Sequence, residues 1–515
     1  MQSQSAALDR RIASWDFWAL LLVALAVLAS VKYHAGGWLW AEPDLYMVDH
    51  LSDRSFLSKI LCPNALDAAY YQSRPLDHLL EFIDAHFIYY CTLAGHPHFL
   101  SLTSYLLIAG LCLVNWHFAR KILGHDPSLL LLVLLLFWTT TVIFLGGVHL
   151  RSGKSGVAFL STLLIWRLVA HLRRAAPGAI IQFKWQHWAE VFLLVIGLCL
   201  MDPQGGYISL ACLATVGAFL LTDRRRVALS ICVAAALALA GSFLWVRIVD
   251  PFLIRHVNGF DVSYSYGLKR WHSLRYNTLQ SIVTFHLWEG LTLVLDSIRF
   301  YLGNVPRVLA SFVFGFAVYV AHKTTAPMPA ALRLRWMPGF GLGSLGVMTW
   351  FILAIPLNIV LLVMLPGAGE DLRRVLYVRI PTGMLVLLGA TFFVHRLHTF
   401  GWVSRSALRG ILIALLVSNV LAIPSHDEIG RIGYSMGYRE ATPIMIDALK
   451  QLVRLPRPAV IEKRYDFSRN ARTPLKRALR AGPKFPEIRT DQDYLNSSHY
   501  YNFMRSQYGL PFAQE

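Results

Sequence analysis

Charged residues are scarce in this chain. They make up 15% of its 515 residues, and the mean hydropathy is +0.48. Soluble domains contain about 25% charged residues and about 45–50% apolar ones, whereas this sequence is 56% hydrophobic. The apolar residues also gather in long runs, and runs of about 18 or more residues with few charges are candidate transmembrane helices. The composition argues against a soluble enzyme and predicts a polytopic membrane protein.

Metal-binding, nucleotide-binding and nucleic-acid-binding patterns are lacking as well. No two of the six cysteines form a CxxC pair, so the common thiolate metal motifs are excluded. The stretch Gly153–Gly156 lacks the GxxxxGK[ST] spacing of a phosphate-binding P-loop. The net charge of +18 comes from short Lys and Arg clusters beside apolar runs, without a basic stripe interleaved with aromatics. We therefore expect no nucleotide P-loop and no nucleic-acid partner.

The apolar runs predict about eleven membrane spans. The first run has no small-residue cleavage pattern and is expected to be a retained helix. Lys and Arg clusters follow alternate runs, as the positive-inside rule requires, which places the N-terminus in the cytoplasm and the C-terminus outside. The predicted spans lie near residues 17–33, 98–117, 128–148, 155–170, 188–202, 207–222, 227–248, 306–322, 342–365, 375–395 and 406–423.

Two long loops are predicted on the external side, at residues 34–97 and 249–305. The second contains residues 281–302, whose charges favour an interfacial amphipathic helix, although a span there would invert every later side. In the first loop, Cys62 and Cys91 are expected to form a disulfide in an oxidising periplasm. The first loop is also acidic, because it holds three bases against eight acids: Glu42, Asp44, Asp49, Asp53, Asp67, Asp77, Glu81 and Asp84.

The C-terminal tail, residues 424–515, is predicted to be a small soluble α/β domain on the external side. Its sequence is typical of helices at 442–453 and 473–480 and of a strand at 459–465. The fold class that follows is an all-α polytopic membrane protein, with helices in its external loops. Its transmembrane domain covers residues 1–423.

An acidic motif follows the first span directly. The segment Trp38–Asp44 reads WLWAEPD, with Glu42 and Asp44 two residues apart beside tryptophans typical of a membrane interface. A carboxylate at the level of the lipid headgroups is suited to act as a general base. The alternative is a solvated loop held by an aromatic anchor, and spacing alone favours that alternative.

The arrangement as a whole resembles the GT-C superfamily of membrane glycosyltransferases, which includes protein O-mannosyltransferases and lipid A aminoarabinose transferases. The resemblance is carried by the cytoplasmic N-terminus, the Glu42-Pro43-Asp44 motif in the first external loop, the number of spans and the external tail. The segment Arg373–Pro381 is similar to the Arg-Tyr…Pro element of the family, except that Leu376 precedes Tyr377. The resemblance implies a polyprenyl-phosphate-linked sugar donor. It also implies Asp44 as general base, Glu42 as its orienting or metal-binding partner and Asp49 as a reserve.

Sugar transfer from a lipid phosphate also needs fixed cations for the departing phosphate, and the planar donor fork of arginine suits this task. A divalent cation between that phosphate and Glu42 or Asp44 is chemically reasonable, although no sequence feature demands one. Asp202 belongs either to a tight turn before Pro203 or to the same external site. The predicted phosphate-binding residues on the external side are Arg74, Arg151, Lys154, Arg270, Arg374 and Arg379.

We therefore expect a glycosyltransferase of a bacterial inner membrane that transfers a sugar on the periplasmic side to a lipid, glycan or protein acceptor. The alternatives are an O-antigen polymerase or ligase, and a transporter or flippase of lipid-linked glycans. Spans mostly free of ionisable residues favour surface chemistry over translocation. The sequon Asn496-Ser497-Ser498 leaves a lumenal tail in the endoplasmic reticulum as an alternative location.

Overall fold

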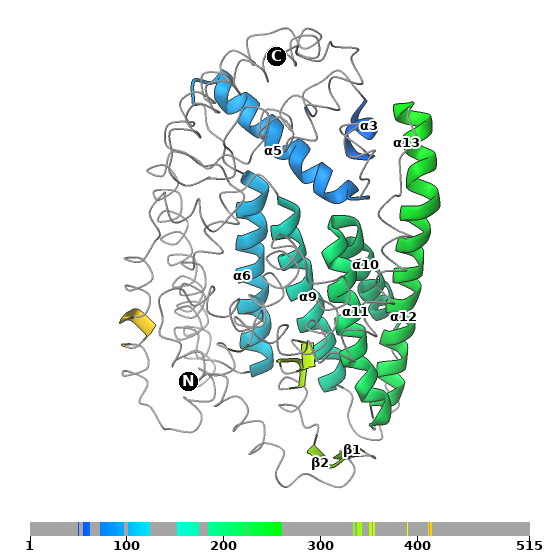
Figure 1. Ribbon diagram of the computed structural model, residues 1–515. Helices are drawn as coiled ribbons and strands as arrows, with labels where there is room; N and C mark the ends of the chain where they lie inside the picture. Colours follow the sequence, from blue (N-terminus) through cyan, green and yellow to red (C-terminus); the bar gives the residue numbers. More distant parts are fainter. Residues whose placement is uncertain are drawn as a thin grey trace, which may run out of the picture.

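A bundle of apolar helices dominates the computed structural model of the chain (Figure 1). The helices of the bundle are α6 (Leu102–Leu123), α9 (Ser152–Arg174), α10 (Trp185–Met201), α11 (Pro203–Gly217) and α12 (Arg225–Leu244). The structure describes residues 50, 55–61, 73–96, 101–123, 152–174, 184–222, 224–259, 333–334, 337–341, 350–352, 354–355, 389, 410 and 412–414.

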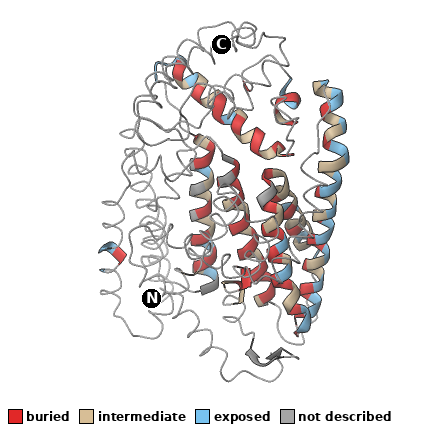
Figure 2. Cartoon of the chain, in the orientation of Figure 1, coloured by how far each residue is buried: buried red, intermediate tan, exposed pale blue. Residues whose placement is uncertain are grey.

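Packing within the bundle follows the apolar faces of the helices. α6 packs against α9, and α10 packs against α9, α11 and α12. Between α6 and α9, the fully buried Trp166 donates its indole N–H to Asn115 Oδ1 at 3.0 Å and stacks on Phe118. Buried residues lie where the helices meet, and exposed ones follow the outer face of α12 (Figure 2). The bundle therefore has an ordinary close-packed interior in which the buried polar groups named here are paired.

Three of the described helices are long and apolar enough to cross a membrane: Leu102–Lys121, Ser155–Arg173 and Arg225–Asn258. Trp185–Met201 and Gly205–Leu221 are apolar but shorter. The regular secondary structure of the described residues is helical apart from a short antiparallel pair of strands, β1 (Arg333–Leu334) and β2 (Met337–Gly341). This confirms the helical class for the described part. The other predicted spans and the tail at 424–515 lie outside the described residues.

The last helix of the bundle continues well beyond its predicted end at residue 248. A π-helical turn, η2 (Trp245–Val249), leads directly into α13 (Asp250–Asn258), and Gly259 ends the helix with a left-handed φ of 74°. The continuous helix of 34 residues is about 51 Å long, whereas a bilayer core is about 30 Å thick. α13 therefore projects past the end of the bundle (Figure 1).

The two ends of the bundle differ in charge. α6 and α9 both begin, and α10 ends, next to a further helix, α5 (Pro75–Leu93), which runs obliquely across this end of the bundle (Figure 1). Lys and Arg lie at the opposite end, and they belong to the clusters that the sequence analysis assigned to one side of the membrane. These residues are Arg120, Lys121, Arg173, Arg174, Lys184, Arg224, Arg225 and Arg226.

The prediction of a Cys62–Cys91 disulfide is wrong for this structure, because Cys91, one of the described cysteines, carries a free thiol. Cys62 itself lies outside the described residues.

Candidate functional site

Helix α5 forms the centre of the candidate site. It arises from the acidic first loop, begins with Pro75 in its first turn, and contacts α6, α9 and α10 on one side and α3 (Phe56–Leu61) on another. Asp77, Glu81 and Asp84 recur every three or four residues, so they share a helical face. Their exposed fractions are only 2%, 4% and 2%. Buried carboxylates are costly unless they are paired, which makes the partners of each one informative.

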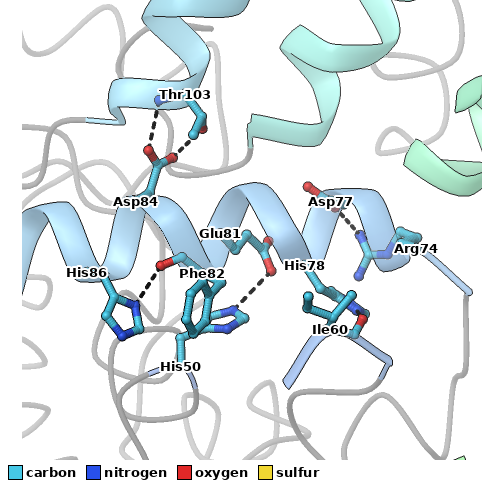
Figure 3. Close-up of polar contacts among 10 residues, drawn as sticks. All are labelled: His50, Ile60, Arg74, Asp77, His78, Glu81, Phe82, Asp84, His86 and Thr103. Carbon is cyan, nitrogen blue, oxygen red and sulfur yellow. Dashed lines mark hydrogen bonds and ion pairs between the residues drawn. The ribbon is translucent and has the colours of Figure 1, made fainter. Parts of the chain in front are cut away.

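Asp84 has a structural role at the start of α6 (Figure 3). Its Oδ2 accepts hydrogen bonds from the Ser101 hydroxyl at 2.5 Å and the Thr103 hydroxyl at 2.7 Å, and its Oδ1 accepts the Thr103 backbone N–H at 2.8 Å. A carboxylate is favoured there by the free N–H groups and by the positive end of the helix dipole. Asp84 therefore connects α5 to α6.

Glu81 contacts a histidine from the segment that follows the acidic motif (Figure 3). His50 Nε2 lies 3.7 Å from Glu81 Oε2, and the His50 side chain is fully buried. Burial holds the pKa of His50 well below its ordinary value of 6.5, and the nearby His78, His86 and Lys59 lower this pKa further. At neutral pH the contact therefore joins a neutral imidazole to Glu81.

Asp77 has a different environment from the other two carboxylates. Its Oδ2 accepts a hydrogen bond from Arg74 Nη1 at 3.3 Å (Figure 3), whereas its buried Oδ1 has no hydrogen-bond partner within the described part of the chain. A Cβ atom built at Gly153 would lie closer than 3.0 Å to this Oδ1. The Asp77 carboxylate therefore rests against the first turn of α9, and glycine at 153 makes the approach possible.

This contact brings together two segments that lie far apart in the sequence, the one around Arg74 and the one around Lys154. Arg74 lies with Asp77 beside the first turn of α9, and that turn contains Lys154. Gly156 continues the close packing, since a Cβ there would lie closer than 3.0 Å to the sulfur of Met201 at the end of α10. The first turn of α9 thus contacts α5 through Gly153, and the next residues contact α10 through Gly156.

Asp250 contacts the segment that immediately precedes α5. It is fully buried at the beginning of α13, and its Oδ2 accepts a hydrogen bond from the Ser73 hydroxyl. Asn258, at the end of α13, donates to the Ser58 carbonyl oxygen at 3.4 Å, so α13 also contacts α3. These contacts span up to 200 residues of sequence. They place α3, α5 and α13 together beyond one end of the bundle.

Asp202 forms the turn that its neighbours predict. α10 ends at Met201, α11 begins at Pro203, and the Asp202 carbonyl oxygen accepts the Gly205 N–H at 2.8 Å. Because Met201 packs against Gly156, the turn lies at the same end of the bundle as α5.

Of the predicted site residues, the structure describes Arg74 fully and Lys154 by its backbone. Asp77 was counted among the acids of the first loop but was not recognised as a site residue, although its helical spacing to Glu81 and Asp84 after Pro75 is a usable signal. Among the described residues no group of three or more His, Cys, Asp or Glu could hold a metal ion. The predicted residues outside the described ranges are Glu42, Asp44, Asp49, Arg151, Arg270, Arg374 and Arg379.

Near the basic end of the bundle, the spans are less apolar than expected. Arg167 of α9 forms an ion pair with Glu190 of α10, and His171 Nε2 lies 3.3 Å from Glu190 Oε2. The rings of His171 and His187 have centroids 4.6 Å apart. The expectation of spans mostly free of ionisable residues therefore has an exception at this pair of helices. Hydropathy averages over a window and does not register a few charges that neutralise one another across a helix interface.

Comparison with protein-family models, with curated proteins and with solved structures finds no match for this chain.

Proposed function

We propose that this chain is a GT-C-type membrane glycosyltransferase, which transfers a sugar from a polyprenyl-phosphate-linked donor to a lipid, glycan or protein acceptor. The observation that carries the proposal is the position of α5, whose buried carboxylates lie against the end of an apolar bundle. The sugar of a membrane-anchored phosphate would lie at the level of the membrane surface, where this end of the bundle lies. Its transfer needs both carboxylates and cations there.

The charge difference between the ends of the bundle supports a proposal about the side of the membrane on which the reaction takes place. The basic end matches the cytoplasmic side under the positive-inside rule, so α5 and the first loop would face the periplasm of a bacterial inner membrane. The N-terminus would then be cytoplasmic and the tail at 424–515 periplasmic.

In the proposed reaction Asp44 takes the proton from the acceptor hydroxyl, oriented by Glu42, with Asp49 as the alternative base. The acceptor oxygen bonds to the anomeric carbon, and the bond from that carbon to the phosphate oxygen breaks. The electron pair leaves with the polyprenyl phosphate. Cations stabilise the charge that develops on this phosphate.

The cations proposed for the donor phosphate begin with Arg74 and the start of α9. Arg74 lies beside the first turn of α9, and free N–H groups and the helix dipole favour an anion there. Lys154 belongs to this turn and Arg151 immediately precedes it in the sequence. The further candidates are Arg270, Arg374 and Arg379.

One observation favours a second function. Arg167, His171 and Glu190 place ionisable groups between two helices of the bundle, and such groups in spans often mark translocation pathways. A flippase for lipid-linked glycans is therefore the second candidate.

A reconstitution experiment separates the two functions. The full-length protein in liposomes receives undecaprenyl-phosphate-linked radiolabelled sugars and a membrane extract as acceptor. We expect sugar transfer with release of undecaprenyl phosphate, and a loss of roughly 10²–10⁴-fold in Asp44→Asn, because asparagine cannot accept the proton. Movement of the intact donor between leaflets without sugar release would refute the enzyme and support the flippase.

A further inference from the structure

The three buried carboxylates of α5 differ in how completely they are bonded. Asp84 accepts three hydrogen bonds, and Glu81 faces His50. Asp77 is equally buried, but its Oδ1 has no hydrogen-bond partner among the described residues. Buried polar atoms in folded proteins almost always have partners, so Asp77 Oδ1, like Asp250 Oδ1 at the start of α13, calls for an explanation. Both oxygens of the Asp84 carboxylate therefore accept hydrogen bonds, whereas Oδ1 of Asp77 has no hydrogen-bond donor among the described residues.

The open oxygen points at the start of α9. A Cβ at Gly153 would lie closer than 3.0 Å to Asp77 Oδ1, so the carboxylate touches the first turn of a helix of 23 residues. The N–H groups of a first turn have no partners within the helix. Arg74 donates a hydrogen bond to the other oxygen of Asp77, Oδ2. A ligand at this position would therefore meet a helix N-terminus, a guanidinium and a carboxylate together.

We propose that Asp77 Oδ1 accepts a hydrogen bond from a hydroxyl of the donor sugar, while the phosphate of the same lipid lies at the start of α9 near Arg74. This inference rests on the proposed function and identifies the sugar-binding part of its site. Asp77 makes and breaks no covalent bond in this role. It orients the sugar, and the proton of the acceptor passes to Asp44.

The chemistry at Asp77 favours a hydroxyl over other ligands. A phosphate directly on Oδ1 would be repelled by the carboxylate. A divalent cation needs several oxygen ligands, and the described residues contain no group of three or more His, Cys, Asp or Glu suited to a metal ion. A sugar hydroxyl supplies the missing donor without adding charge. A hydrogen bond to an ionised acceptor is also roughly twice as strong as a neutral one.

A binding comparison tests the inference without requiring turnover. The full-length protein in lipid nanodiscs is titrated with undecaprenyl phosphate and with the same lipid carrying glucose, mannose or galactose, and the sugar bound most tightly is used. The measured quantity is the preference for the sugar-bearing lipid over the bare one. In Asp77→Asn, Arg74 takes the only amide oxygen and an NH₂ faces α9. We expect the preference to fall about tenfold without any loss of affinity for the bare lipid, because removing the negative charge of Asp77 does not weaken a phosphate site beside Arg74.

A second variant changes the residue of α9 that contacts the Asp77 carboxylate. Gly153→Ala places a methyl group against Asp77 Oδ1 and should also reduce the preference. Gly241→Ala is the matched control, because the Cβ added there meets nothing within 4 Å in the described part of the chain. Gly241→Ala should bind both lipids like the wild type.

Each outcome decides between the two proposals. If both site variants keep the wild-type preference, or lose affinity for both lipids equally, the role of Asp77 is overturned, and sugar transfer by the wild type would leave the proposed function standing. If the wild type binds both lipids without preference, the role of Asp77 is likewise overturned. A wild type that binds neither lipid would overturn the proposed function as well.

Discussion

Replacing Asp84 should destabilise the protein more than replacing Asp77, although both carboxylates lie on one face of α5 and are 2% exposed. Asp84→Asn removes the charge and turns one acceptor oxygen into a donor. The groups opposite it are the Ser101 hydroxyl at 2.5 Å, the Thr103 hydroxyl at 2.7 Å and the Thr103 N–H at 2.8 Å, all of which donate. The amide oxygen can still accept the Thr103 N–H, but the amide NH₂ then faces two hydroxyls that donate unless they turn round to accept.

The magnitude follows from those three bonds. A hydrogen bond to a charged group contributes about 1.5–3 kcal/mol, and a buried donor left without a partner costs about 1–3 kcal/mol. The hydroxyls of Ser101 and Thr103 can rotate toward other acceptors, whereas the backbone N–H cannot. We therefore expect Asp84→Asn to lower the free energy of unfolding by roughly 3 kcal/mol, from the weakening of three hydrogen bonds to a charged acceptor. Asp77→Asn should lower it by less, about 1.5 kcal/mol, because the ion pair with Arg74 loses its negative charge while Arg74 can still donate to the amide oxygen.

The assay is denaturant-induced unfolding of the full-length protein in mixed micelles, followed by tryptophan fluorescence. Thr92→Val serves as the control on the same helix, because the Thr92 hydroxyl donates only to the Ile88 carbonyl oxygen within α5. Its loss should be about 1 kcal/mol or less. Equal stabilities of Asp84→Asn and Asp77→Asn would refute the division of α5 into a structural and a ligand-binding carboxylate.

Two further predictions concern pH and topology. The lowered pKa of His50 means that the unfolded chain takes up a proton below pH 6.5 before the folded protein does, so stability should fall with acidification at up to about 1.4 kcal/mol per pH unit. His50→Gln should make the free energy of unfolding less dependent on pH. If chemical denaturation from pH 7.5 to pH 5.5 gave the same slope for this variant as for the wild type, the role of His50 would be refuted. Reporter fusions after Gly95 and after Gly178 should report opposite sides of the membrane, since α9 crosses the bundle from the α5 end to the basic end. A fusion after Gly437 should match Gly95, and signals from the same side at Gly95 and Gly178 would refute the arrangement.

Hydropathy located the described bundle helices but not their ends. The run at 155–170 became α9 (Ser152–Arg174), because a helix continues through a terminal basic turn that lowers the local hydropathy. The end predicted at 248 missed α13 altogether. Pro251 normally interrupts a helix, yet here it follows the π turn Trp245–Val249, where the regular i→i−4 pattern is already given up. The local sequence composition does not indicate that the helix continues through Pro251.

What the sequence determined by itself is the presence of helices long and apolar enough to cross a membrane, the helical character of the described bundle and the gathering of basic residues at one of its ends. Each of these depends on short windows of residues, in which apolar length and charge have a direct energetic meaning in a bilayer. Only the tertiary structure decided that Asp77 meets Gly153 and that Ser73 meets Asp250, 177 residues away. Such contacts depend on which helices pack together and on the small residues that allow close approach. No local pattern of a single sequence encodes that pairing.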